Sequence, residues 1–489
     1  MTELIPIPRS ISGGKGKFVL QPSTVIMVPM NHREIPFIGQ FLADRLRPAT
    51  GFDLPVRHLA GSSQGNIVMK LDEAHSDPGS EGYDLKIEPG GIQLLAAHPA
   101  GLFHGVQTIL QCLPPKIEKG FEQPGPWEMD CVHFRDFPQF TWRGAMLDVA
   151  RHFFDATAVK RLIDQLAFYK FNILHLHLTD DSGWRIKINS WPRLTEVGST
   201  TDFTSGSGGY YSQEEYRQIV AYAAARYITI VPEVDMPAHI NSALASYAEL
   251  NENGTATTLS PGMLGESSSL AIHKEITYKF LEDVLGEISA LTPGPFLHIG
   301  GDEAMSTPEE DYKIFINRVL NMVHGLGKRS VGWEEIIHAD TLPDTILQHW
   351  LQMPLAQTAA SRGQKLILSP AFKIYLDMKY DPSTPIGLDW IGKPLEVQEA
   401  YDWDPLQFLE EVPGEAILGV EAPLWTETVT SQDEMDYMFF PRLVGCAEIG
   451  WSGSSKGTWE DYRSRLASHG PRLENRGIHF YHSPQVDWK

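Results

Sequence analysis

Two patterns of apolar and polar positions divide the chain. Up to residue 138, short alternating runs at residues 17–20, 66–70 and 83–87 are separated by Gly, Pro and Ser, which is typical of strands. Pro89-Gly90-Gly91 predicts a turn, and residues 101–110 have a helix-like pattern. We expect a small, non-catalytic α+β domain over residues 1–138, with the Pro-rich stretch 124–138 as its junction to the second domain.

From residue 139 to residue 489, buried strand-like runs alternate with amphipathic helices. Val159, Leu162, Ile163 and Leu166 share one helical face, for example. Eight candidate strands lie at residues 145–149, 173–178, 227–234, 296–299, 330–333, 346–350, 365–368 and 416–421. This alternation predicts a (β/α)8 TIM barrel, whose chemical residues lie at the C-terminal ends of the strands. The seventh helix is the poorest match, because residues 382–403 resemble a long loop suited to lining a cleft.

Composition excludes some classes of partner. The chain has 489 residues and a net charge of 40 − 62 = −22, so nucleic acid is an unfavourable partner. No apolar run is long enough to predict a membrane helix, and the first ten residues do not resemble a signal peptide. The three cysteines, Cys112, Cys131 and Cys446, predict neither a disulfide framework nor a metal site. We therefore expect a cytoplasmic protein, or a secreted one if a signal peptide has been trimmed.

Polar residues follow most of the predicted strands. The most informative segment runs from His298 to Glu303, where two glycines precede the adjacent carboxylates Asp302 and Glu303. Paired acids fit chemistry in which one group transfers a proton and another stabilises charge. The remaining residues after strands are Asp148, Arg151, Asp180, Asp181, Glu233, Asp235, His239, Trp333, Glu334, Glu335, Trp350, Glu421, Trp425 and Glu427. Their recurrence around a barrel predicts one shared pocket.

Acids, an arginine and tryptophans suit a neutral sugar, because carboxylates bind hydroxyls and indoles stack on apolar sugar faces. We interpret Trp333, Trp350, Trp390 and Trp425 as such platforms. By contrast, Trp127, Trp142, Trp184 and Trp191 are interpreted as packing residues.

His175 and His177 leave a second enzyme class open. Residues at i and i+2 face the same side of a strand, so the two histidines and Asp180 are candidate ligands of a divalent metal. No later strand ends in a further histidine pair, and we favour their interpretation as barrel-interior residues. We expect neither a metal nor another cofactor.

Four ordered motifs resemble the family 20 glycoside hydrolases, the β-N-acetylhexosaminidases. They are Arg143-Gly-Ala-Met-Leu-Asp148-Val-Ala-Arg151-His152, Leu174-His-Leu-His-Leu-Thr-Asp180-Asp181, Val234-Asp-Met-Pro-Ala-His239 and His298-Ile-Gly-Gly-Asp-Glu303. Residues 1–138 resemble that family's non-catalytic domain. The resemblance implies an exo-acting, retaining hydrolase in which the substrate's acetamido oxygen attacks the anomeric carbon to give an oxazolinium intermediate. The implied substrates are GlcNAc- or GalNAc-terminated glycans, including chitooligosaccharides, and the implied state is a monomer or homodimer.

The resemblance also implies roles for single residues. Glu303 is the acid/base, Asp302 orients the acetamido group, and Asp180 and His239 support the acid. We expect the carboxyl with the raised pKa to be that of Glu303. The implied substrate-binding residues are Arg151 on hydroxyls 3 and 4, Tyr375 on the acetamido oxygen, Asp377 near hydroxyl 6, Glu427 on hydroxyls 4 and 6, Trp333, Trp350 and Trp425 as pocket walls, and Trp390 under the next sugar.

Two features depart from the family pattern. Ala238 stands where the family commonly has glycine before the histidine, and no cysteine pair supports the nearby loop.

Two further functions would also use a sugar-binding pocket. An inactive lectin is expected to have lost Asp302 or Glu303, and both are present. An enzyme that releases disaccharides needs a wider pocket than Tyr375, Asp377 and Glu427 predict.

Overall fold

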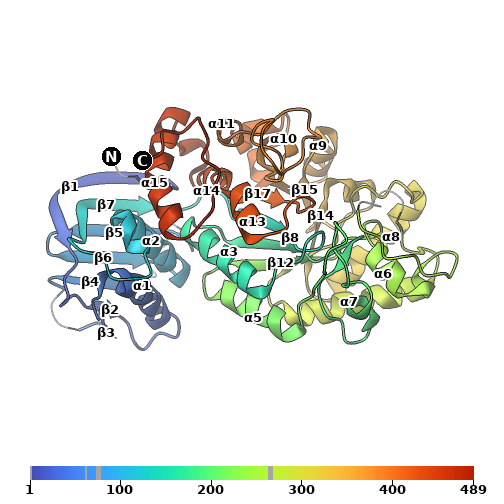
Figure 1. Cartoon of the computed structure of the whole chain (residues 1–489), viewed down its shortest axis with the longest axis horizontal. Coiled ribbons are helices and arrows are strands. Elements are labelled where there is room, and N and C mark those ends of the chain that lie inside the picture. The colour runs from blue at the N-terminus through green and yellow to red at the C-terminus, as the bar shows by residue number, and fades with distance from the viewer. Residues whose placement is uncertain (1–2, 61–62, 73–78, 263–267) are drawn as a thin grey trace. The chain divides into compact units, whose positions relative to one another are not determined.

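Eight parallel strands close into a barrel in the part of the chain that the structure, a computed structural model, describes: residues 3–60, 63–72, 79–262 and 268–489. The chain divides into two compact units, Met1–Gln139 with Ala167–Lys170 and Ala447–Lys489, and Phe140–Leu166 with Phe171–Cys446. Figure 1 shows the elements of both. The predicted boundary at residue 138 stays a prediction, and the last forty or so residues group with the N-terminal unit.

The first unit is built on a mixed sheet. Among its described residues the strand order is β1-β7-β5-β6-β4-β2-β3. The strands are β1 (Ser10–Val19), β2 (Ile26–Val28), β3 (Val56–His58), β4 (Asn66–Leu71), β5 (Tyr83–Glu88), β6 (Gly91–Ala96) and β7 (Glu128–Asp136). The unit's helices are α1 (Ile35–Thr50), α2 (Pro99–Cys112), the 3-10 turn η1 (Pro115–Glu118) and α15 (Trp459–Asn475). The α+β prediction is confirmed.

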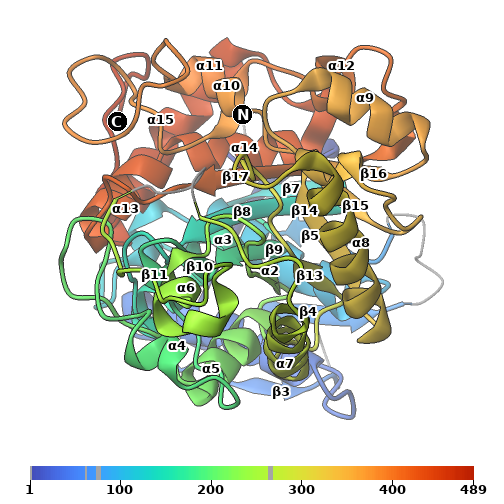
Figure 2. The same cartoon turned by 90° about the vertical axis from the view of Figure 1, so that its right-hand side faces the viewer.

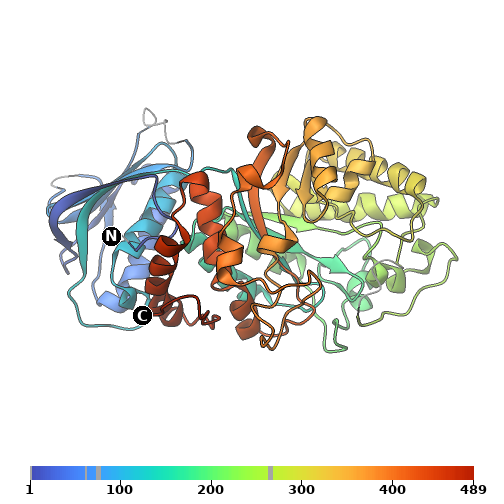
Figure 3. The same cartoon turned by 90° about the horizontal axis from the view of Figure 1, so that it is seen from above.

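Buried and exposed residues alternate along the strands of this sheet, so one face of the sheet is available for helices to pack on. In β6, Ile92 and Leu94 are buried whereas Gln93 between them is exposed. Helix α2 packs closely on the buried face, since a Cβ at Gly105 would lie 2.3 Å from Leu94 Cδ1. Figure 3 shows α1 and α2 beside the blue-to-cyan sheet. The predicted junction at residues 124–138 is wrong for most of its length, because β7 pairs there with both β1 and β5.

The second unit contains the barrel. Its strands, in chain order, are β8 (Trp142–Asp148), β9 (Ile173–His177), β12 (Thr229–Glu233), β13 (Phe296–His298), β14 (Arg329–Trp333), β15 (Ile346–His349), β16 (Lys365–Leu368) and β17 (Ile417–Leu424). A short hairpin, β10 (Thr179–Asp180) and β11 (Gly183–Trp184), follows β9. The register closes through parallel pairing of β17 with β8 and of β8 with β9. All eight predicted strands are confirmed, with ends that differ by a few residues.

Helices surround these strands, and Figure 2 shows the long helices α7 and α8 outside them. The helices are α3 (Ala156–Phe168), α4 (Arg193–Glu196), α5 (Gln213–Ala224), α6 (Asn241–Ser246), α7 (Glu275–Leu291), α8 (Glu309–Gly325), α9 (Met353–Ser361), α10 (Ala371–Ile374), α11 (Val397–Tyr401), α12 (Pro405–Phe408), α13 (Gln432–Phe439) and α14 (Arg442–Ser452). Between β16 and β17 the chain forms only the short helices α10, α11 and α12 and a 3-10 turn at Gly414–Ala416, which agrees with the poor seventh-helix pattern. No helix of the described residues is long and apolar enough to cross a membrane.

The barrel interior consists of two kinds of layer. Towards the strand starts, Trp142, Ile173, Val231, Val331, Ile346 and Ile367 form an apolar cluster. Burying each such side chain contributes roughly 1.5–3 kcal/mol. One step further along the strands, the inward positions carry His175, Glu233, His298, Gln348 and Glu421, all buried. Buried polar groups are costly unless they are paired, so this polar layer requires its own network of contacts.

Candidate active site

The loop after β13 delivers two carboxylates to the end of the barrel. Gly300 and Gly301 have φ values of +63° and +101°, a backbone conformation that residues with a side chain rarely adopt. A Cβ at Gly300 would lie 1.7 Å from Asp235 Oδ1, and one at Gly301 would lie 2.4 Å from Ile336 Cγ2. Only glycine therefore fits both positions. The tight turn brings the adjacent Asp302 and Glu303 out at the mouth of the barrel.

A cavity of about 410 Å³ opens where the strands end. Its lining comprises Arg151, His239, Asp302, Glu303, Trp333, Trp350, Leu351, Tyr375, Asp377, Leu388, Trp390, Trp425 and Glu427. Eleven of the twelve predicted site residues are among these. Asp180 is the exception, since it lies behind the surface against Arg151 and His239. Leu351 and Leu388 were not predicted, because an isolated leucine after a strand or within a loop gives no sign of lining a pocket.

A chain of charged contacts supports Glu303 from behind. His239 Nε2 lies 3.3 Å from Glu303 Oε2 and 3.9 Å from Asp302 Oδ2. On the other side of the ring, Nδ1 lies 3.5 Å from Asp180 Oδ2. Asp180 Oδ2 also lies 2.8 Å from Arg151 Nη2. Asp180 therefore joins the proton-transfer end of the cavity to its cationic side.

The two adjacent carboxyls differ in proton affinity. Burial, reinforced by the charges of Glu233 and Glu303, raises the pKa of Asp302. The His239 imidazole, 3.3 Å away, lowers the pKa of Glu303, whose side chain is 41% exposed. The expectation that Glu303 has the raised pKa is therefore wrong. It neglected His239: burial lowers the pKa of that imidazole, but Asp180, Glu303 and Asp302 together hold it well above its ordinary value.

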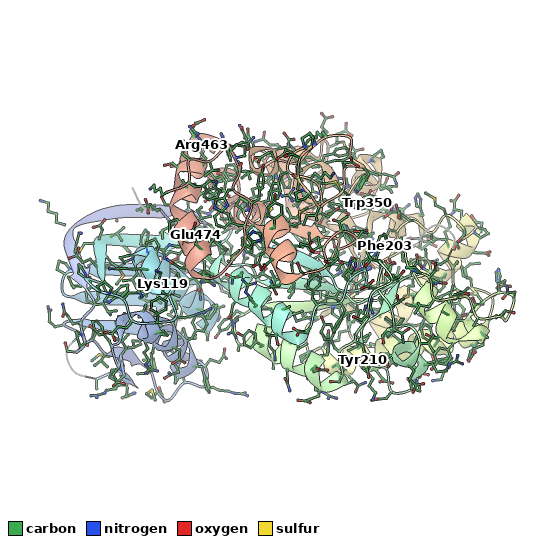
Figure 4. All side chains as sticks on the ribbon, viewed as in Figure 1. Lys119, Phe203, Tyr210, Trp350, Arg463 and Glu474 are labelled. Atoms are coloured by element: carbon green, nitrogen blue, oxygen red, sulfur yellow. The ribbon has the colours of Figure 1, made fainter. Side chains whose placement is uncertain are left out.

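Aromatic rings form the walls. Trp350, labelled in Figure 4, stacks with Tyr375 at 6.3 Å between centroids and 13° between planes. The ring centroid of Trp425 lies 5.7 Å from that of Trp333 and 6.4 Å from that of Tyr375. Trp390 is edge-on to both Trp350 and Tyr375 and is 47% exposed. Indole and phenol rings therefore enclose the cavity, while Trp390 offers an exposed ring at its rim.

The closed end of the cavity carries hydrogen-bonding groups that have no protein partner. Both carboxylate oxygens of Asp377 and Oε2 of Glu427 are buried, and no described residue hydrogen-bonds them. Burial raises the pKa of both groups, and the charge of Glu427 raises that of Asp377 further. Arg151 stands over the Trp425 ring at 4.8 Å. A ligand that carries several hydroxyl groups can donate hydrogen bonds to these unpaired oxygens of Asp377 and Glu427.

Two acids after β14 support the wall without lining it. Glu334 accepts hydrogen bonds from the backbone N–H groups of Leu351 and Gln352 and contacts His349 Nδ1 at 2.5 Å. Glu335 accepts the indole N–H of Trp350 at 3.2 Å. The prediction that the acids after β14 line the pocket is therefore wrong for Glu334 and Glu335. They instead position Trp350 and the loop that follows it.

The histidines of β9 are engaged by carboxylates. His175 contacts Glu421 Oε1 and Glu233 Oε2 at 2.8 and 2.9 Å, and His177 contacts Glu233 and Asp180 at 2.5 and 3.0 Å. Burial lowers the pKa of His175, but the two glutamates raise it to about 9 overall. His177, Asp180 and Asp235 do lie close enough to share a metal ion. A metal would, however, have to displace protons that these carboxylates hold on the rings.

Features outside the cavity agree with their interpretation as structural. Trp127, Trp142, Trp184 and Trp191 are all buried. Ala238 is also fully buried, and the residue after it, His239, has a positive φ of +51°. The three cysteines are free, and two of them are buried.

Comparison with known proteins gives one consistent result. The family model described as glycosyl hydrolase family 20, catalytic domain, matches residues 140–313 and 304–454, and family 20 domain 2 matches residues 1–137. The β-N-acetylhexosaminidase of Cellulomonas fimi is 36% identical over 489 residues, 99% of this chain and 97% of that protein. Among solved structures, the family 20 β-N-acetylhexosaminidase of Streptomyces coelicolor A3(2) superposes with a TM-score of 0.97 at 47% identity, over 100% of this chain and 99% of that one. The Streptomyces plicatus N-acetyl-β-hexosaminidase in complex with thio-NAglucal gives 0.96 at 49% identity, over 100% and 98%.

Proposed function

The chain belongs to glycosyl hydrolase family 20 and is a β-N-acetylhexosaminidase, and we propose that it removes terminal β-linked GlcNAc or GalNAc by substrate-assisted catalysis. The observation that carries the mechanism is the position of the two carboxylates. Asp302 and Glu303 leave the same loop and lie within 3.9 and 3.3 Å of one imidazole nitrogen. Two acids on the same side cannot attack and protonate from opposite faces of the sugar, so the nucleophile comes from the substrate.

Glu303 is the proposed acid/base. Its side chain is the more exposed of the pair, 41% against 13% for Asp302, so it can reach the glycosidic oxygen at the cavity mouth. His239 and Glu303 share one proton in the active form, which then protonates the leaving group. After the leaving group departs, the same carboxylate accepts a proton from water that opens the cyclic intermediate, which gives net retention.

Asp302 and Tyr375 are proposed to guide the acetamido group. The carboxylate of Asp302 accepts the amide N–H and stabilises the positive charge that develops as the acetamido oxygen attacks the anomeric carbon. Burial raises the pKa of Tyr375 well above its ordinary value, so its hydroxyl keeps its proton and donates to the acetamido oxygen. Trp333, Trp350 and Trp425 enclose this group and exclude water.

Arg151 and the unpartnered acceptors Glu427 and Asp377 are proposed to recognise the sugar hydroxyls. Arg151 binds hydroxyls 3 and 4, Glu427 binds hydroxyls 4 and 6, and Asp377 binds the 6-hydroxyl. These groups close the inner end of the cavity, which favours a single terminal sugar over release of a disaccharide. Trp390, at the rim, stacks under the next sugar of a chitooligosaccharide. An inactive lectin gives no reason to retain both Asp302 and Glu303.

A panel of 4-nitrophenyl glycosides tests this function. We expect hydrolysis of the β-linked 2-acetamido-2-deoxy glucoside and galactoside and of chitooligosaccharides from the non-reducing end. Plain β-glucoside, which lacks the internal nucleophile, should be inert. Comparable rates on plain and N-acetylated glucosides would exclude the proposal.

A further inference from the structure

Acids and histidines alternate from the cavity into the barrel interior, well beyond the residues that touch substrate. The order is Glu303, His239, Asp180, His177, Glu233, His175 and Glu421. The successive nitrogen–oxygen distances are 3.3, 3.5, 3.0, 2.5, 2.9 and 2.8 Å. The last two carboxylates have fully buried side chains. Nothing in the proposed chemistry requires acids at that depth.

Glu233, at the end of β12, is the branch point of this series. Its Oε2 contacts His177 and His175, whereas its Oε1 accepts the indole N–H of Trp333 at 2.9 Å. Trp333 lines the cavity wall, and His177 holds Asp180 from behind. One buried carboxylate therefore fixes both a wall of the substrate pocket and the support of the acid/base.

The surroundings keep Glu233 charged. Burial alone would raise its pKa, but the neighbouring histidines His298, His177 and His175 hold it well below its ordinary value, and of these His177 and His175 have raised pKa values themselves. His298 Nδ1 lies 3.0 Å from Oε1 but accepts the backbone N–H of Gly300, and burial lowers the pKa of that ring. The negative groups that face Glu233 at longer range are Asp235 and Asp302.

The carboxylate in turn determines the charge of His177. Burial lowers the pKa of this imidazole, but Glu233 and Asp180 hold it well above its ordinary value, against the opposing charge of Arg151. A protonated ring can donate from both nitrogens at once, whereas a neutral ring donates from only one. Arg151 Nη1 also lies 3.3 Å from Nε2, and a guanidinium can only donate. The closer contact of Nε2 with Asp180, at 3.0 Å, is a hydrogen bond only when Nε2 carries a proton, so donation to Glu233 and Asp180 at the same time requires the protonated ring.

We propose that Glu233 is a positioning residue of the hydrolase: it keeps His177 doubly donating so that Asp180 stays against Arg151 and His239, and it anchors Trp333. This inference rests on the proposed function. Without the Glu233 charge the pKa of His177 would fall, so the ring would lose its proton at a lower pH than in the wild-type enzyme, and Asp180 would then lose a donor. A displacement of about 1 Å in such support can cost roughly 10²-fold in rate.

The test compares Glu233→Gln with the wild-type enzyme on 4-nitrophenyl N-acetyl-β-glucosaminide across pH. We expect kcat/KM to fall about 10²-fold, and to fall further as pH rises in a range where the wild-type profile is flat. Glu233→Asp keeps the charge and should keep the wild-type shape even with a lower rate. Glu448→Gln is the matched control, since it removes an equally buried carboxylate that contacts Arg465 in the other unit; its profile should not change.

Three outcomes would overturn the inference: wild-type kcat/KM in folded Glu233→Gln, a loss that is equal at every pH, or the same change of shape in Glu448→Gln. Should Glu233→Gln not fold, the wild-type enzyme gives the answer by nitrogen NMR of its histidine rings, with His177 assigned by His177→Gln. We expect both His177 nitrogens to be protonated at pH 8, and a neutral ring there contradicts the proposal. A wild-type enzyme that hydrolyses none of the glycosides would instead contradict the proposed function itself.

Discussion

His239 Nε2 lies 3.3 Å from Glu303 Oε2, which joins an imidazole that is 3% exposed to a carboxylate that is 41% exposed. In the proposed mechanism this pair holds the proton that is delivered to the leaving group. Because the imidazole binds the proton more strongly before substrate enters, the resting pair is an imidazolium and a carboxylate. Loss of that shared proton, and not the ordinary titration of a lone glutamic acid, should therefore limit activity at high pH.

The first prediction concerns the pH profile of kcat/KM. The raised pKa of Asp302 means that its carboxylate is lost as pH falls, so the acid limb should lie above the ordinary value of 3.8. The raised pKa of His239 means that the shared proton is lost only above its ordinary value of 6.5. Initial rates on an unactivated substrate from pH 3 to pH 10 test both limbs. A basic limb below pH 6.5 would contradict the role of the pair.

The second prediction concerns the leaving group. Glu303→Gln removes the carboxyl group that delivers the shared proton to the glycosidic oxygen, so cleavage of chitobiose should slow by about 10²–10⁴-fold. A 4-nitrophenyl leaving group departs without protonation, and its release should be affected much less. Parallel measurements on the two substrates give the ratio. Equal losses on both would show that Glu303 is not the acid.

The third prediction concerns the loop that presents the two carboxylates. In Gly300→Ala the new methyl group collides with Asp235, which accepts the backbone N–H of Gly301 at 3.1 Å. We expect kcat to fall by at least about 10²-fold as Asp302 and Glu303 move. Gly286→Ala is the control, because a Cβ there meets nothing within 4 Å in helix α7. That variant should keep full activity and gain roughly 0.5–1 kcal/mol in the free energy of unfolding. Activity of Gly300→Ala at the control's level would refute the argument.

The fourth prediction concerns metals. Each ring nitrogen of His175 and His177 faces a carboxylate, so a metal ion bound to either ring would have to displace a proton or a carboxylate contact. Dialysis against excess EDTA should therefore leave kcat/KM unchanged. If chelation abolished activity and Zn²⁺ restored it, the group of His177, Asp180 and Asp235 would become the first place to look for the ion.

The sequence predicted the barrel because each strand is a short buried run, and the period of the intervening helices is regular. Helix α1 was not predicted, although Ile35, Ile38, Leu42 and Leu46 have helical spacing, and Pro48 lies inside it, where proline ordinarily interrupts a helix. The Pro-rich stretch before the barrel was also interpreted as a junction, whereas β7 in fact pairs there on both sides.

The sequence could predict which residues form the site, but not the proton affinities of its carboxyl groups. Motif positions brought Arg151, Asp302 and Glu303 to one cavity, because the ends of parallel strands converge. The inverted proton affinities of Asp302 and Glu303 depend on His239, whose distance to each acid follows only from the fold. Leu351 and Leu388 line the cavity through loops, and loop paths carry no periodic signal.

The most direct test of the central claim replaces the hydrogens of the substrate's acetyl methyl group with one, two and three fluorines in a 4-nitrophenyl series. Fluorine withdraws electrons and weakens the acetamido oxygen as a nucleophile without removing it. If that oxygen attacks the anomeric carbon, kcat/KM should fall steeply and regularly with each fluorine. A kcat/KM that does not change across the series would contradict substrate-assisted catalysis and would require a nucleophile from the protein.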